Sequence, residues 1–303
     1  MIQALFDGIL VGSVLSLGAI GLTLVMHILR FANFSHAELL SVGAYCALTF
    51  DAILSAVAPP LQTLIGPFSM SFALALATIV SVGITGLTAV LVDRLVFKRL
   101  RATAGPLTLV FASFGVALIM RNVIALVFGL HSQRYSDDIS FAVMISADPL
   151  LLIKPDQVII LCIAVVAMAA LHLLLNRTTL GFALRAVAEN PTLAQVNGIS
   201  MPSMVRLTWM IGGGLAAVAG VLYGLDNQLS PVMGRDLVLS LFAAAIVGGL
   251  GSVSGAVLGG FIVGLASSFA ILLLPAGYKP AIPFLVILAT LYLRPNGLFG
   301  EAR

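Results

Sequence analysis

Several stretches of about 20 residues in this chain contain no charged side chain, or almost none. Each is long enough to cross a hydrocarbon core about 30 Å thick. Because lipid offers the backbone no hydrogen-bond partner, such stretches are expected to fold as helices. They lack the alternation of polar and apolar residues that marks strands, which argues against a barrel. The sequence therefore predicts an all-α, polytopic transmembrane helical bundle.

The composition supports one membrane domain spanning residues 1–303. Of these residues 60% are hydrophobic and only 9% are charged, and the mean hydropathy is +1.15. An ordinary soluble domain has about a quarter charged residues, so that class is excluded. We expect eight or nine spans, because the seventh and ninth candidates are short and some spans are broken. The candidates are 5–28, 39–58, 68–92, 106–128, 157–176, 205–226, 237–250, 255–274 and 281–294.

Charge in the loops predicts the orientation. Basic residues gather after the third span and in a polar segment, residues 177–203, that we call the platform; they are Arg94, Lys98, Arg99, Arg101, Arg177 and Arg185. The loop between the fourth and fifth spans is acidic, with Asp137, Asp138, Asp148 and Asp156. Cytoplasmic loops carry the excess of Lys and Arg. The N-terminus is therefore expected outside, and the platform and the C-terminus in the cytoplasm.

The platform reads as two short helices between two strongly apolar stretches. Thr178 and Thr179 can cap a first helix that ends at Glu189. Asn190 followed by Pro191 is typical of a second helix start, and Gly198 suits a left-handed stop. A membrane protein with such a paired-helix platform on one side usually offers it to a partner.

Glycines recur at a spacing of four residues, as in Gly8/Gly12, Gly220/Gly224 and Gly260/Gly264. Small residues at this spacing let helix backbones approach closely in lipid, so we expect them at helix contacts. The run that contains Gly248, Gly249 and Gly251 differs, because it interrupts an apolar stretch. Helices that unwind beside a translocation path have such interruptions.

A polar break follows the first span and contains Asn33, Phe34, Ser35, His36 and Glu38. Ionisable groups at membrane depth are costly and mark a pathway or a hinge. Alternatively, the segment is a plain cytoplasmic turn with Glu38 near a helix start, where negative charge is favoured. One His and one Glu do not form a metal-coordination set, so no metal is expected.

Arg121 lies well inside the fourth span. Two interpretations stay open for this intramembrane charge. It can pair with Asp51, Asp226 or a substrate carboxylate, or it can extend to the outer interface with its head in water.

Catalytic motifs are absent from the sequence. No phosphate-binding G-x-x-x-x-G-K-[ST], H-E-x-x-H, G-x-S-x-G or cysteine pair at ligand spacing occurs, so no catalytic residue is assigned. The basic residues sit at helix ends and indicate no nucleic-acid partner; membrane lipids are the expected surroundings. The chain is expected to move a solute, or to hold a protein that does.

Four stretches in order resemble the permease subunits of bacterial ATP-binding-cassette importers for branched-chain amino acids. They are GLTLVMHILRFANFSHAELLSVGAY, GFALRAVAENPTLAQVNGIS, FAAAIVGGLGSVSGAVLGG and LRPNGLFG. The resemblance covers nearly the whole chain and fits the shorter of the two paired permeases. It implies an importer permease fold of the branched-chain amino acid/ribose type in the bacterial inner membrane.

The resemblance also implies partners. These are a second homologous permease, two cytosolic ATPases that bind ATP and Mg, and an extracytoplasmic solute-binding protein; this chain itself holds no cofactor. By the same likeness, the ATPase-coupling residues are Gly181, Arg185, Glu189, Asn190 and Gly198. Asn33, Phe34, His36 and Glu38 match the family's first helix break beside the pathway, although Ala37 stands where the family usually has glycine.

The solute is expected to be a branched-chain amino acid or a related small polar molecule, such as urea, an amide or an aromatic carboxylate. A competing class is an autonomous secondary transporter or channel, in which 29–38 and 247–255 form an ion site. Few carboxylates inside the spans speak against ion coupling. A third class is an inert scaffold subunit.

Overall fold

The computed structural model describes residues 1–136, 142–147 and 150–300. In this part of the chain, seven helices are long and apolar enough to cross a membrane, in agreement with the predicted bundle. Six of them are α1 (Ile2–Leu29), α2 (His36–Val57), α5 (Pro106–Phe128), α6 (Pro155–Arg177), α9 (Met201–Asp226) and α11 (Val253–Ala270). The seventh is α3 (Phe72–Val92), which continues through the π-helical turn η2 (Asp93–Phe97) into α4 (Lys98–Thr103).

The predicted seventh and ninth spans are shorter helices, α10 (Met233–Gly248) and α12 (Ile282–Leu293). The platform forms α7 (Thr179–Glu189) and α8 (Pro191–Val196), and two 3₁₀ helices are η1 (Pro59–Gln62) and η3 (Ala276–Ala281). One antiparallel hairpin, β1 (Val143–Ala147) with β2 (Leu150–Ile153), was not predicted. Asp137, Asp138 and Asp148 of the acidic loop lie outside the described residues.

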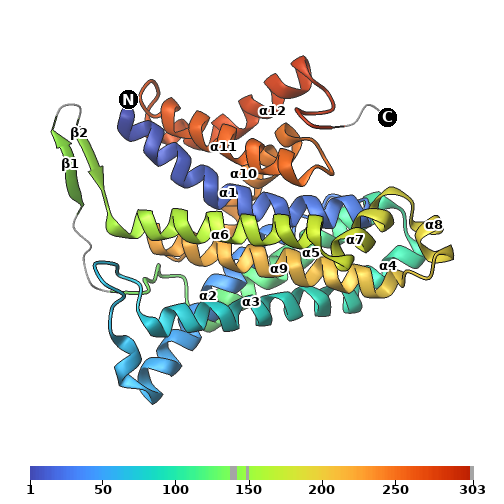
Figure 1. Ribbon diagram of the computed structural model, residues 1–303, viewed down its shortest axis with the longest axis horizontal. Coiled ribbons are helices and arrows are strands. Elements are labelled where there is room, and N and C mark those ends of the chain that lie inside the picture. The colour runs from blue at the N-terminus through green and yellow to red at the C-terminus, as the bar shows by residue number, and fades with distance from the viewer. Residues whose placement is uncertain (137–141, 148–149, 301–303) are drawn as a thin grey trace.

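Helix α1 lies in the middle of the bundle. In Figure 1, α10, α11 and α12 lie on one side of it, and α2, α3 and α9 lie on the other. The hairpin and the N-terminus are at one end of the bundle, while α7 and α8 are at the opposite end, which we call the platform end. This central position explains why α1 is the most deeply buried of the seven candidate spans.

Small residues bring α1 and α11 into backbone contact. A methyl group on Gly264 would collide with the backbone of Gly12, and one on Gly260 would collide with Ser16. The Ser16 hydroxyl donates a hydrogen bond to the Val257 carbonyl across this contact, at 2.8 Å. The glycine pairs therefore act as predicted, since such close packing compensates for the missing hydrophobic drive in lipid.

Small residues also bring the backbones of α2 and α9 close together. Gly43 of α2 packs on Ala217, and Gly220 of α9 packs on the backbone of Leu40. The Ser81 hydroxyl of α3 also donates to the Gly43 carbonyl, at 2.8 Å. Helices α2, α3 and α9 thus form one tightly packed group against α1.

Replacing Gly264 with Ala should destabilise the protein, because the added methyl group overpacks the contact with Gly12 at a cost of about 1–3 kcal/mol. Gly115, in α5, is the matched control, since a methyl group there meets nothing within 4 Å. Thermal unfolding of the detergent-purified protein should show a lower Tm for Gly264→Ala and an equal or higher Tm for Gly115→Ala. Equal Tm values for the two variants would contradict the packing role.

Candidate translocation site

After α1 the chain turns back into the bundle. Arg30 takes the left-handed conformation (φ 57°) and ends α1. Six residues later, α2 begins beside the middle of α1, where the His36 Nε2 lies 3.2 Å from the Gly18 carbonyl oxygen. His36 is 0% exposed and Glu38 is 1% exposed. The polar break therefore lies inside the bundle and not in an exposed turn.

Side chains of the break stabilise the start of α2. The Asn33 Oδ1 accepts hydrogen bonds from the Ser35 backbone N–H at 3.2 Å and from the Ser35 hydroxyl at 2.7 Å. These bonds replace the partners that water provides at an exposed helix end. Ala37 follows within the first turn of α2, in ordinary helix, so the backbone here does not require a glycine.

Phe34 connects the break to α5 and α10. Its ring stacks between those of Phe114 and Phe242, with centroid distances of 4.0 and 4.5 Å. Its backbone N–H donates to the Ser113 hydroxyl at 3.1 Å. A movement of the break would therefore change its contacts with both α5 and α10.

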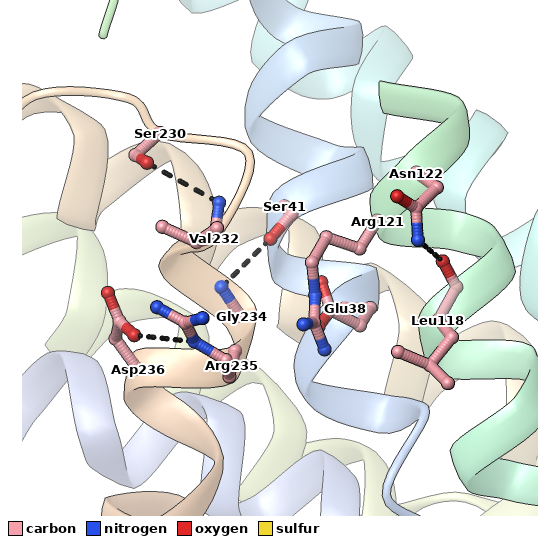
Figure 2. A network of polar contacts seen from close by, with 10 residues as sticks. All are labelled: Glu38, Ser41, Leu118, Arg121, Asn122, Ser230, Val232, Gly234, Arg235 and Asp236. Carbon is pink, nitrogen blue, oxygen red and sulfur yellow. Dashed lines mark hydrogen bonds and ion pairs between the residues drawn. The ribbon is translucent and has the colours of Figure 1, made fainter. Parts of the chain in front are cut away.

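Glu38 forms an ion pair with Arg121 of α5 (Figure 2). Its Oε1 accepts from the Arg121 Nε at 3.2 Å and lies 3.1 Å from the Nη2. The expected pairing of Arg121 with Asp51 or Asp226 was wrong. The start of α2 faces this point of α5, whereas Asp51 lies near the end of α2 and Asp226 at the end of α9. At 1.5 Å per residue, Arg121 lies about 22 Å along α5 from its start, well inside a core about 30 Å thick.

Helix α10 also begins inside the bundle, next to Glu38. The Gly234 backbone N–H donates to the Ser41 hydroxyl of α2 at 3.0 Å. A methyl group on Gly234 would lie 2.6 Å from the Glu38 Oε2, so only a glycine lets the carboxylate approach this closely. A carboxylate at a helix N-terminus is stabilised by the partial positive charge there. Helices α2 and α10, which both begin within the bundle, thus start at one polar cluster.

Three polar side chains extend this cluster to the surface of the bundle. The Arg235 and Asp236 side chains, 57% and 55% exposed, pair with each other at 3.2 Å. Asn122 of α5 is also exposed and donates to the Leu118 carbonyl. We call the surface of Arg121, Asn122, Arg235 and Asp236 the α5–α10 face. Sequence reasoning missed Arg235 and Asp236, because the predicted seventh span began at 237 and left them in a loop.

The glycine break lies at the other end of α10. Gly249 and Gly251 have φ values of 102° and 100° and form the turn into α11. Backbone N–H groups of the C-terminal segment, at Leu298 and Phe299, donate to the carbonyls of Val247 and Gly248 at 2.9 and 3.0 Å. The structure therefore does not bring Gly248, Gly249 and Gly251 to the Glu38 cluster; they lie at the platform end.

The platform is capped as predicted. The Thr178 hydroxyl accepts from the Gly181 N–H, the Asn190 side chain accepts from the Leu193 N–H, and Gly198 has φ 82°. Gly181 packs directly on the backbone carbonyls at the end of α6. Arg185 and Glu189 are exposed and line a groove beside α6.

The described residues contain no group of three His, Cys, Asp or Glu side chains that could hold a metal ion. The Glu38 cluster offers the chemistry of paired charges and helix N-termini. Such an arrangement recognises polar solutes or switches between two pairings.

Known proteins with similar sequences are permeases. The chain is 30% identical to the branched-chain amino acid permease BraD of Pseudomonas aeruginosa, over 99% of this chain and 96% of that protein. It is 28% identical to LivH of Escherichia coli K12, with the same two coverages. A probable LivH of Methanocaldococcus jannaschii is 32% identical over 96% of this chain and 90% of that protein. No solved structure matches.

The model of one family, described as the permease component of the branched-chain amino acid transport system, matches residues 4–291. That match runs from the first turn of α1 to the last turn of α12. The chain is a multi-pass membrane protein and belongs to this family of transport permeases.

Proposed function

We propose that this chain is the membrane-spanning permease subunit of an ATP-binding-cassette importer. It forms half of a pore for branched-chain amino acids or a related small polar solute. The observation that carries the proposal is the platform, which extends from one end of the bundle (Figure 1) and exposes apolar side chains. Phe182, Leu193 and Val196 are 63%, 58% and 80% exposed. Apolar groups exposed together on a helix pair favour a protein partner.

The partner that fits this surface is an ATPase, because the chain lacks a phosphate-binding loop of its own. The complete importer then contains a second homologous permease, two ATPases holding ATP and Mg, and a solute-binding protein. The platform is cytoplasmic in this arrangement, and the N-terminus is outside. The binding protein delivers the solute from outside and sets most of the selectivity.

The joints of the platform support a mechanical role. Thr178 alone separates α6 from α7, and the packing of Gly181 on the end of α6 makes this joint stiff. Helix α9 follows the platform in the chain, and its Gly212 packs against Gly21 of α1 and the His36 ring. A push by the ATPases on the platform thus reaches the start of α2 through α9. We infer that it switches the pore between inward- and outward-facing states.

Charge at membrane depth supports an assignment of the face that lines the pore. A charged side chain in the centre of a bilayer costs at least about 2.5–3.5 kcal/mol, so exposed Arg235 and Asp236 do not face lipid. The α5–α10 face instead borders a water-filled path between this chain and the second permease. The solute therefore passes Arg121, Asn122 and the start of α10.

Uptake by reconstituted vesicles tests the whole assignment. Vesicles with both permeases, the ATPases and the binding protein should accumulate leucine only when ATP is supplied on the ATPase side. Vesicles with this chain alone should not accumulate it. Accumulation by the chain alone, driven by a proton or sodium gradient, would establish the autonomous secondary transporter instead.

Exchanging Leu193 and Val196 for Asp should remove the ATPase from the complex. The two side chains each contribute about 1.5–3 kcal/mol when buried, so the double variant should lower ATPase co-purification at least tenfold. Leu126 and Val127 of α5, which are also strongly exposed, provide a matched apolar pair outside the platform. Their exchange for Ala should leave co-purification unchanged, and wild-type binding by Leu193→Asp/Val196→Asp would refute the docking surface.

Water access tests the pore face. In a background with Cys46 and Cys162 replaced by Ala, Asn122→Cys should react with a charged thiol reagent in the assembled importer, since thiolates form only in water. Val166→Cys is the control, because Val166 is 66% exposed in the middle of α6 and should face lipid. Equal labelling of both positions, or labelling of position 166 alone, would place the path elsewhere.

A further inference from the structure

A groove lies on the side of the bundle where α6 and α11 both pack on α1. Its volume is about 880 Å³, and its walls come from α1, α6, α7 and α11. Away from the platform it is lined by apolar side chains, the buried Ile20 and Leu24 on α1 and the more exposed Val165 and Met168 on α6. Part of this wall lies along α6 from Val165 to Asn176, about 16 Å at 1.5 Å per residue.

Polar side chains of the groove gather at its platform end. They are His27, His172, Asn176, Arg185, Glu189 and Ser254. The groove is thus apolar at membrane depth and polar near the membrane surface, as a phospholipid is. A soluble ligand would not match the apolar walls, and a plain hydrocarbon chain would not match the polar end.

Arg185 gives the polar end its ligand preference. Its Nη1 donates to the Asn176 Oδ1 at 3.2 Å, and its guanidinium lies 4.8 Å from the Phe182 ring centroid. Asn176 in turn contacts the His172 ring at 3.2 Å. The contacts with Asn176 and Phe182 orient the guanidinium. Among the described residues no carboxylate lies within 4.0 Å of Arg185, so its remaining N–H donors have no carboxylate partner.

We propose that this groove binds an anionic phospholipid, with an acyl chain between α1, α6 and α11 and its phosphate on Arg185. Phosphate matches the planar donors of an arginine, and the contact is charge-assisted. Among the described residues that line this end of the groove, Glu189 is the one carboxylate, and it repels a second anionic group. The lipid wedges the platform against α1, so it sets the position of the element on which the proposed ATPase acts.

The test measures bound lipid and needs no transport, so it stands apart from the proposed function. The full-length protein is placed in nanodiscs of equimolar phosphatidylglycerol and phosphatidylcholine, transferred to detergent and examined by native mass spectrometry. Wild-type protein should retain phosphatidylglycerol in preference to phosphatidylcholine. Arg185→Gln should lower the retained phosphatidylglycerol about tenfold, and Arg185→Lys should restore part of it.

Two further variants separate the groove from general membrane affinity. Arg206→Gln, at an exposed arginine that does not line the groove, should keep wild-type retention. Ala169→Trp, which fills the apolar wall, should lower retention of both lipids while the protein stays monodisperse on size exclusion. Equal retention of both lipids by wild type, or unchanged retention in Arg185→Gln, would overturn the proposal. So would loss of the lipid on assembly with the second permease, because a protein segment would then occupy the groove.

Discussion

The Glu38 carboxylate of α2 contacts two other helices, which come from distant parts of the chain. Arg121 approaches from α5, and the start of α10 approaches at Gly234. Removing one partner of a buried ion pair leaves the other charge uncompensated, which costs about 3–5 kcal/mol. Because α2 begins inside the bundle, the N–H groups at its start depend on protein partners such as Asn33, and the Gly234 N–H at the start of α10 binds the Ser41 hydroxyl. The remaining contacts of the site are arranged around this pair.

Features that depend on nearby residues could be predicted from the sequence. The long spans follow from apolar windows, since the bilayer fixes the length of a helix that crosses it. The platform follows from cap residues, because Thr178 and Asn190 bind N–H groups only three residues ahead. The glycine pair Gly260/Gly264 indicated a close helix contact. The glycine spacing did not predict which helix packs against α11.

Features that depend on distant residues could not be predicted. Glu38 and Arg121 are 83 residues apart, and the sequence around each residue does not indicate that the other is its partner. Arg235 and Asp236 looked like loop residues, because a charged pair before an apolar run is ordinary at a membrane surface. The structure places them deeper, since α10 starts beside Ser41. Likewise, the role of the C-terminal segment appears only when Leu298 and Phe299 are seen to bind the end of α10.

The two interruptions of the bundle differ in how easily they can rearrange. At the α10–α11 turn, Gly249 and Gly251 have conformations that other residues rarely adopt, and Gly297 and Gly300 pack on the Gly249 backbone. That turn is fixed by backbone contacts and has little room to change. At the starts of α2 and α10 the contacts are between side chains, and Arg121 reaches a single oxygen of Glu38 while 20% of its side chain stays exposed. An ion pair of this kind can exchange partners with Arg235 or with a passing solute. We therefore expect conformational change to occur at the Glu38 cluster, while the α10–α11 turn moves as one body with α1.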